Sequence, residues 1–325
     1  MQGKVMSERS AAAVYAGIDV SKDWLDVYLH PVGVRRRVAN SPDGVRGLRR
    51  TLDAHAVGLV VLEPTGKYHR LAYRTLAVWG YGVAVVNPLR ARLFAEAIGV
   101  LAKTDRIDAR MLAVMAQTLQ PQATPPAASQ LEGLQELVSA RQAATAEATA
   151  LSNRLGATRT GFLRSELRRR IASLNTHIAR LEAEIERQLH ADPTLANRRA
   201  ILMSIPGIGP VAATTLVVGL AELGSCSDKA ATLLVGLAPI ARDSGDSSGQ
   251  RHIRGGRGPV RHGLYMAALA AARYNPDLKA FYNRLRANGK AAKLALIAVM
   301  RKLVVLANTL ISQNRCWTPI PPKTP

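Results

Sequence analysis

Two aspartates three residues apart, Asp105 and Asp108, lie between basic residues in the segment Lys103–Arg110. An apolar run with helical spacing begins at Ile107, so this segment predicts the first turn of a helix. Residues three apart on a helix share one face. Alone, the pair is explained by a solvated first turn, where the helix macrodipole favours carboxylates. With further acids it becomes a candidate metal site, because a carboxylate cluster requires a cation to neutralise it.

Two further acids, Asp19 and Glu63, stand at the ends of apolar runs that predict buried strands. Either acid alone has an ordinary explanation, since Asp19 precedes Ser21 and Glu63 precedes Pro64 in turn-like sequence. The interest lies in having both at strand ends, followed by Asp105 and Asp108 at a helix start.

The order of predicted elements decides whether these four acids can meet. The pattern predicts strands over 14–20, 24–29, 35–39, 58–63 and 81–87, and helices over 43–55, 67–79 and 89–98 with a further one after Lys103. Three antiparallel strands followed by parallel strand–helix units give a mixed sheet with helices on both faces, the order of the ribonuclease H-like fold. Ligands of such α/β sheets collect at the carboxyl ends of strands. Four carboxylates there would bind two divalent metals that clamp the attacking and leaving oxygens of a phosphodiester.

The composition indicates the kind of partner. The chain has 325 residues, a formal net charge of +21 and a pI of about 10.9. This length predicts two domains, and this charge predicts a polyanionic partner such as nucleic acid. Cys226 and Cys316 are isolated and have no zinc-like spacing, which favours a reducing cytoplasm. The uncharged run 201–221 is long enough to span a bilayer, but prolines and glycines interrupt it, so it predicts two buried helices.

That interruption, Ile205–Pro210, has the pattern of a helix-hairpin-helix turn. Gly207 and Gly209 would let the backbone approach a phosphate at the start of the next helix. A plain tight turn between core helices explains the same residues.

The middle of the chain is helical. Residues 121–130 are rich in Pro, Gln and Ala and predict a linker. Between 131 and 192 the chain predicts long helices, and Leu167–Ile185 carries apolar residues in 4-3 spacing, a seam that fits a coiled coil or an intramolecular helical hairpin. The arginines beside it, Arg164, Arg168, Arg169 and Arg170, are either a solvated face or a nucleic-acid contact.

The segment Gly236–Pro259 combines glycines, serines and arginines between two predicted helices. A serine hydroxyl among arginines suits attack on a phosphodiester, because arginine stabilises charge on the phosphoryl oxygens. The spacing alone does not choose among Ser244, Ser247 and Ser248. The basic candidates for nucleic-acid contact in and beside this segment are Arg242, Arg251, Arg254, Arg257 and Arg261.

The ordered motifs carry a family resemblance. Gly17–Lys22, Leu62–Gly66, Lys103–Ala109, Ile205–Gly209 and the Gly236–Pro239 and Asp243–Gly245 pair occur in the order found in DEDD transposases of the insertion-sequence 110 type. The chain resembles this family over roughly residues 14–310. Each motif is of moderate specificity, whereas the ordered set is highly specific.

The resemblance implies an architecture: a RuvC-like domain (14–120), a linker (121–130), a coiled-coil or helical-hairpin segment (131–192), a mainly α-helical transposase domain (197–312) and a tail (313–325). It also implies that Asp19, Glu63, Asp105 and Asp108 bind Mg²⁺ (or Mn²⁺), and that Ser244 forms a covalent serine–DNA intermediate. The implied partners are DNA (element ends and target), a structured bridge RNA and further copies of the chain in a dimer or tetramer. The implied location is the bacterial cytoplasm, near the nucleoid.

Two other functions explain parts of the pattern. A RuvC-like nuclease would use the metal site with water as the nucleophile, and the serine would be incidental. A basic nucleic-acid-binding scaffold would have structural carboxylates only. The scaffold is disfavoured, because a binder gains nothing from four acids directed at a polyanion.

Overall fold

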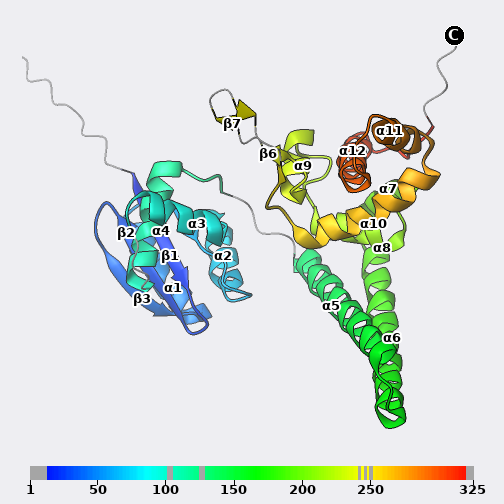
Figure 1. The fold of residues 1–325 in the computed structure, drawn as a ribbon. Coiled ribbons are helices and arrows are strands. Elements are labelled where there is room, and N and C mark those ends of the chain that lie inside the picture. Colours follow the sequence, from blue (N-terminus) through cyan, green and yellow to red (C-terminus); the bar gives the residue numbers. More distant parts are fainter. Residues whose placement is uncertain are drawn as a thin grey trace, which may run out of the picture. The chain divides into compact units, whose positions relative to one another are not determined.

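The computed structural model describes residues 13–100, 105–123, 129–240, 243–244, 247–248 and 252–319. The chain divides into two compact units, Met1–Ala127 and Ala128–Pro325, drawn in Figure 1. Part of the predicted linker and the end of the predicted tail lie outside the described residues.

The first unit is built on a five-stranded mixed sheet. Its strands are β1 (Val14–Val20), β2 (Trp24–His30), β3 (Arg35–Ala39), β4 (Val57–Leu62) and β5 (Gly82–Val85), in the order β3-β2-β1-β4-β5. β2 pairs antiparallel with both β1 and β3, while β1, β4 and β5 run parallel. The predicted mixed sheet is therefore confirmed.

Helices cover both faces of this sheet, as predicted. Alternate residues of a strand point to opposite faces. Ile18 and Leu62 pack with α1 (Pro42–Ala54) and α2 (His69–Val78), whereas Val61 packs with α3 (Pro88–Ala97) and α4 (Asp105–Leu119). Two of these helices have clear start signals: the side chains of Ser41 and Asn87 accept bonds from backbone N–H groups of the first turns of α1 and α3, and each is followed by proline.

The second unit is mainly helical. Its helices are α5 (Ser129–Ala157), α6 (Gly161–Ala191), α7 (Pro193–Met203), α8 (Pro210–Gly219), α9 (Asp228–Val235), α10 (Gly258–Tyr274), α11 (Pro276–Ala287) and α12 (Ala292–Ser312). α5 and α6 form a long antiparallel hairpin that projects from the other helices (Figure 1). The helices break between Ala157 and Gly161, and the apolar seam of α6 is buried or half-buried.

The uncharged run at 201–221 is the end of α7, a turn and α8, as predicted. Among the described residues, α12 is the one helix long and apolar enough to cross a bilayer. Much of it is buried in the helical core, where Leu303 and Val304 are fully covered.

The serine-containing segment differs from the sequence prediction. The pattern predicts a loop, whereas the structure has four two-residue strands: β6 (Pro239–Ile240), β7 (Asp243–Ser244), β8 (Ser247–Ser248) and β9 (His252–Ile253). β6 pairs with β9 and β7 with β8, both antiparallel. The two residues between Ser244 and Ser247 are Gly-Asp, a composition typical of tight hairpin turns and the overlooked signal for this pairing.

Candidate functional site

β1 and β4 bring two of the candidate acids to neighbouring positions. In this parallel pair, Ile18 is in register with Leu62, so the residues that follow, Asp19 and Glu63, lie side by side at the carboxyl ends of the strands. Adjacent strands are about 4.8 Å apart. Both acids are half-buried. The structure therefore places Asp19 and Glu63 together, where the sequence predicts them.

Helix α4 contacts β1 at Gly17. A Cβ atom on Gly17 would lie 2.1 Å from the carbonyl oxygen of Ala109 and 2.3 Å from the backbone nitrogen of Ala113. The backbone of α4 thus rests directly on the strand, and only glycine leaves room for it. Asp108 precedes Ala109 in the chain and is half-buried.

Two contacts at the other end of α4 fix its direction. Gln117 bonds to the ring of His30 over 2.8 Å, and the Gln120 amide donates to the Tyr15 hydroxyl over 3.3 Å. Tyr15 is near the start of β1, so α4 runs antiparallel to that strand. The first turn of α4, which begins at Asp105, is consequently at the Asp19 end of β1. The side chain of Asp105 lies outside the described residues.

The donor set fits a hard divalent cation, because carboxylate oxygens are the ligands that Mg²⁺ and Mn²⁺ take. The residues whose side chains are described contain no group of three or more His, Cys, Asp or Glu at metal-binding spacing. Asp19, Glu63 and Asp108 are among the residues whose side chains are described, whereas Asp105 is not.

A fifth acid on this face was missed by sequence reasoning. Asp26 on β2 is directly opposite Asp19 on β1, and Arg37 on β3 is directly opposite Asp26. Directly paired residues project on the same side of a sheet, and paired like charges repel. Arg37 neutralises Asp26 with a two-pronged ion pair, Nε–Oδ1 2.8 Å and Nη2–Oδ2 2.7 Å. The sequence signal for this acid was a charged residue within the strand predicted over 24–29.

The serine candidates belong to the second unit. Ser244 on β7 is in register with Ser247 on β8, and Ser248 is in register with Asp243. Their side chains, together with Arg242 and Arg251, lie outside the described residues. His252 and Arg254, just after this segment, are exposed.

Two of the predicted nucleic-acid contacts have structural partners. Arg257 donates two hydrogen bonds to the Glu222 carboxylate, over 2.7 and 2.5 Å, and one to the Gly219 carbonyl over 3.0 Å. Arg261 donates to the carbonyls of Val235 and Gly255. Burial alone would raise the pKa of Glu222, but the hydrogen bonds and charge of Arg257 outweigh it and leave that pKa below its usual value.

This network predicts that Arg257→Ala destabilises the second unit, because it leaves Glu222 and the Gly219 carbonyl without their shared donor. We expect a loss of about 1–2 kcal/mol in the free energy of unfolding, the range for charge-assisted bonds at a half-exposed site. Thermal denaturation of the full chain measures it. Arg254→Ala removes an equal charge from an exposed position and should leave the transition unchanged; equal transitions for both variants would contradict the structural role.

That ion pair also has a pH signature. A depressed carboxyl pKa stabilises the fold above the ordinary glutamate pKa of about 4.3, and this contribution disappears as the pH falls through the lower folded-state value. The Arg257 contribution should therefore be present at neutral pH and absent in strong acid.

The two glycines of the predicted helix-hairpin-helix turn have different surroundings. Gly207 has φ of +106°, and a Cβ there would lie 2.5 Å from Cα of Ala271 on α10, so core packing and the left-handed backbone explain this glycine. Gly209 has open space around its Cβ position and borders a cavity of about 920 Å³ between α5, α8 and α10. Both glycines line this cavity, but only Gly209 has room for a side chain.

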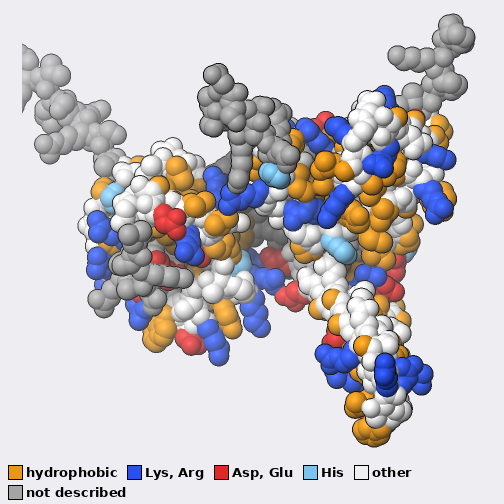
Figure 2. All heavy atoms as spheres, in the orientation of Figure 1, with side chains coloured by type: hydrophobic (Ala, Val, Ile, Leu, Met, Phe, Trp, Pro, Cys, Tyr) orange, Lys and Arg blue, Asp and Glu red, His pale blue; other side chains and the backbone are white. Residues whose placement is uncertain are grey.

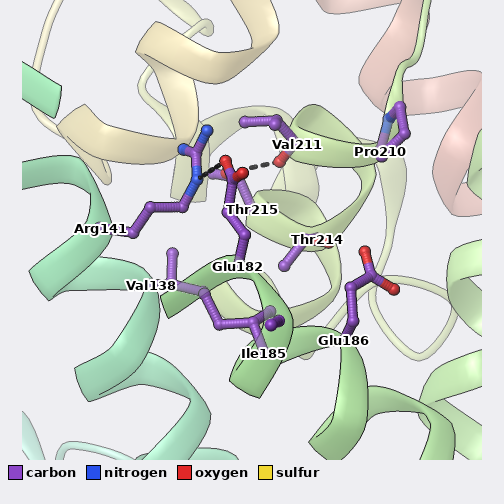
Figure 3. A pocket seen from close by; sticks show the side chains of 10 residues that line it. Val138, Arg141, Glu182, Ile185, Glu186, Pro210, Val211, Thr214 and Thr215 are labelled. Atoms are coloured by element: carbon purple, nitrogen blue, oxygen red, sulfur yellow. Dashed lines mark hydrogen bonds and ion pairs between the residues drawn. The ribbon is translucent and has the colours of Figure 1, made fainter. Parts of the chain in front are cut away.

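The base of the α5–α6 hairpin is fixed to the core by ion pairs, shown in part in Figure 3. Arg141 of α5 donates to Glu182 of α6 over 2.6 Å (Figure 3). Arg199 of α7 pairs with Glu186 of α6 and also donates to the Thr214 hydroxyl over 3.2 Å. Arg141 and Glu182 thus join the two arms, and Arg199 links α6 to α7 and α8 at the base of the hairpin.

The far end of the hairpin is apolar and basic, as the lower part of Figure 2 shows. Phe162 is 70% exposed and Leu163 is 50% exposed. Arg164 donates to the carbonyls of Leu155 and Thr158 and closes the connection between the helices. Arg169 and Arg170 pair with Glu166 and Glu147, and Arg168 is exposed. These pairs favour a solvated face for most of the arginines predicted beside the seam.

Two family models match the chain: one described as a transposase of the DEDD IS110 type over residues 16–162, and one of the IS116/IS110/IS902 transposase family over residues 199–283. The first match spans β1, β4 and α4, and the second spans α8 and the serine segment. The chain belongs to the IS110-type transposases.

Two relatives of this transposase are similar over most of its length, and a third over part of it. The pilin gene-inverting proteins of Moraxella bovis and Moraxella lacunata are each 28% identical over 316 residues, which cover 93% of this chain and 96% of the relative. An uncharacterized protein of insertion element IS110 from Streptomyces coelicolor is 33% identical over 127 residues, 38% of this chain and 30% of that relative.

Proposed function

We propose that this transposase cuts and rejoins DNA in two chemical stages, with a divalent-metal site at Asp19, Glu63, Asp105 and Asp108 and a serine nucleophile at Ser244. The observation that carries the proposal is the arrangement at the carboxyl end of the sheet. There Asp19 and Glu63 directly follow the registered pair Ile18 and Leu62, and α4 packs at Ala109 and Ala113 on Gly17 of the same strand. The first unit is accordingly assigned a RuvC-like fold.

The four carboxylates would hold Mg²⁺ or Mn²⁺, which stabilises charge on the oxygens of the scissile phosphodiester. The protein supplies the positions of the donors. Asp19 and Glu63 are fixed by strand pairing, while Asp105 and Asp108 share the first turn of one helix. Arg37 keeps Asp26 neutralised, so the extra acid does not add its charge to the cluster.

Ser244 would attack the phosphorus atom through its hydroxyl oxygen. A serine–phosphate bond forms, the bond from phosphorus to the leaving DNA oxygen breaks, and the serine proton passes to a base or to water. The reverse step, with a hydroxyl of another DNA end as nucleophile, rejoins the strands and frees the serine. Arginines of the same segment are suited to stabilising charge on the phosphoryl oxygens.

The wider assembly follows from the family resemblance. The proposed partners are DNA element ends and a target, a structured bridge RNA that pairs with both, and further copies of the chain in a dimer or tetramer. The acids and Ser244 belong to different units of the chain, which agrees with a site completed between subunits. The proposed organisation is a RuvC-like domain (14–120), a linker (121–130), a coiled-coil segment (131–192), a transposase domain (197–312) and a tail (313–325).

The assay for this proposal is covalent capture of DNA by the full chain. Wild-type protein with Mg²⁺ and supercoiled element DNA is expected to give a denaturant-resistant protein–DNA adduct and recombinant products. Ser244→Ala should abolish the adduct, and Asp108→Asn should lower its yield at least about a hundredfold, the scale of losing one well-placed charge-stabilising group. Ser247→Ala is the matched control and should retain the adduct.

The other functions give different results. Hydrolysed DNA without an adduct in the wild type would assign a water-dependent nuclease. Salt-sensitive binding without any metal-dependent cleavage would assign a scaffold. Wild-type adduct levels in Ser244→Ala, or in Asp108→Asn, would overturn the proposed role of that residue.

A further inference from the structure

The face of the sheet that carries the acids also carries cations. Strand pairing places Gly17, Tyr28 and Arg35 in one row across β1, β2 and β3, and Asp19, Asp26 and Arg37 in the next. Because directly paired residues share a face, both rows are on the side covered by α4. We refer to Tyr28, Arg35 and Arg37 as the β3 shelf.

The arginines of the β3 shelf are held in place by their neighbours. The guanidinium carbon of Arg35 lies 5.6 Å from the centre of the Tyr28 ring, a cation–π contact. Arg37 is fixed by its two bonds to Asp26, yet 51% of its side chain is exposed. Arg35 is exposed as well. Both guanidinium groups are therefore held in fixed positions: Arg35 lies on the Tyr28 ring at an exposed site, and Arg37 is paired with Asp26 beside it.

The β3 shelf borders the start of α4. A cavity of about 290 Å³ is lined by shelf residues and by Ala109, which follows Asp108. Two strand spacings, roughly 10 Å, separate β3 from β1 and its Asp19. The shelf and the acid cluster are thus adjacent parts of one surface.

A polyanion cannot approach four carboxylates without compensation, because like charges repel unless cations intervene. Metal ions offset this repulsion at the scissile phosphate only. The phosphates on either side require protein cations. Arg35 of the β3 shelf is such a cation beside the acids, and its neighbour Arg37 offsets the charge of Asp26. Exposed arginines on an edge strand also prevent strand-to-strand aggregation, but that role requires neither the Tyr28 contact nor the Asp26 pair.

We infer that the β3 shelf binds the phosphodiester backbone of the DNA strand that enters the acid site, a few nucleotides from the scissile phosphate. Arg35 contacts a backbone phosphate, Tyr28 keeps its guanidinium pointed across the strand, and Arg37 keeps the charge of Asp26 from repelling the DNA. The inference rests on the proposed function, because it takes the acid cluster as the place of cutting.

Site-directed crosslinking without divalent metal tests the binding step separately from cutting. The full-length Arg35→Cys protein is mixed with single-stranded DNA carrying a thiol tether on one backbone phosphate, and crosslinked peptides are located by mass spectrometry. Arg50→Cys is the control, because Arg50 is also exposed but lies on α1, on the opposite side of the sheet. Each variant is also made with Asp108→Asn.

We expect Arg35→Cys to crosslink several-fold more than Arg50→Cys, with and without Asp108→Asn. Separately, Arg35→Gln should lower the slope of log affinity against log salt by about 0.7, the value for one lost phosphate contact on a single strand. Equal crosslinking at both positions would overturn the inference. Crosslinking to a matched RNA but not to DNA would overturn the assignment to a DNA strand. If Ser244→Ala kept the wild-type level of adduct while Arg35→Cys crosslinked strongly, the cutting mechanism would be rejected and the role of the β3 shelf retained.

Discussion

Replacing Gly17 by alanine is expected to abolish DNA cutting and to lower the stability of the first unit by about 3 kcal/mol, the upper part of the range for an overpacked core. The added methyl group would lie 2.1 Å from the Ala109 carbonyl oxygen, so the helix backbone must move. Asp108 is the preceding residue and moves with it, which would disturb the proposed metal site. Hydrogen exchange resolved by peptide should show faster exchange in α4, and the covalent-adduct assay should show the loss of cutting.

The matched control is Gly58→Ala. Gly58 is a strand residue of β4, and the nearest atom to its would-be Cβ is 4.0 Å away. It should leave both the exchange of α4 and the adduct yield unchanged. Full activity in Gly17→Ala would show that the position of α4 on β1 does not matter for the acid site.

The second large effect is expected for Asn308→Ala in the second unit. Asn308 on α12 is 5% exposed. Its oxygen accepts from the Gly224 N–H over 2.8 Å, and its nitrogen donates to the Cys226 carbonyl over 3.0 Å and to Asp228 over 2.8 Å. Truncation removes these three hydrogen bonds, whose partners are half-buried or exposed, and each bond contributes about 0.5–1.5 kcal/mol. We expect a total loss of about 3 kcal/mol in the free energy of unfolding, measured by thermal or denaturant unfolding of the full chain.

The loss of these hydrogen bonds should also reduce function. Residues 224–228 lead into α9, which precedes the serine-bearing strands, so this segment should exchange faster and the Ser244 adduct should fall. Asn197→Ala is the control: its amide bonds to Asn314 over 2.7 Å at the surface, and its loss should cost under about 0.5 kcal/mol. Equal unfolding midpoints for the two variants would contradict the anchoring role of Asn308.

The sequence was sufficient for most of the first unit, because β1, β2 and β4 carry runs or alternations of buried apolar residues and the helices have helical spacing. Asp19 and Glu63 could be placed together because parallel strands end at the same edge of a sheet. The contact between Gly17 and α4 could not be predicted. Nothing in the local pattern around Gly17 specifies which distant helix packs there, and a glycine next to Ile18 has several ordinary explanations.

The arginines were the least predictable residues. Composition correctly indicates a basic chain, but it cannot separate a cation that is free for a phosphate from one that is already paired. Arg257 is paired with Glu222, 35 residues away along the chain, and Arg261 donates to backbone carbonyls. Arg35 and Arg37 drew no attention as sequence, yet strand register brings them next to the acids. Charge gives the class of partner, while tertiary structure gives the contact surface.

The length of the α5–α6 hairpin is independent of the contacts that fix its base. The two arms have similar lengths, 29 and 31 residues. Near the base, Arg141 and Glu182 join the arms, and Arg199 of α7 pairs with Glu186 of α6. At about 1.5 Å per residue, the 29 residues of α5 extend roughly 40 Å. Removing seven residues from each arm would bring the Phe162 tip about 10 Å closer and leave every contact at the base intact. The distance between a ligand bound at the hairpin tip and the helices that carry the serine segment can therefore be changed, in evolution or by design, without disturbing the tip or the base.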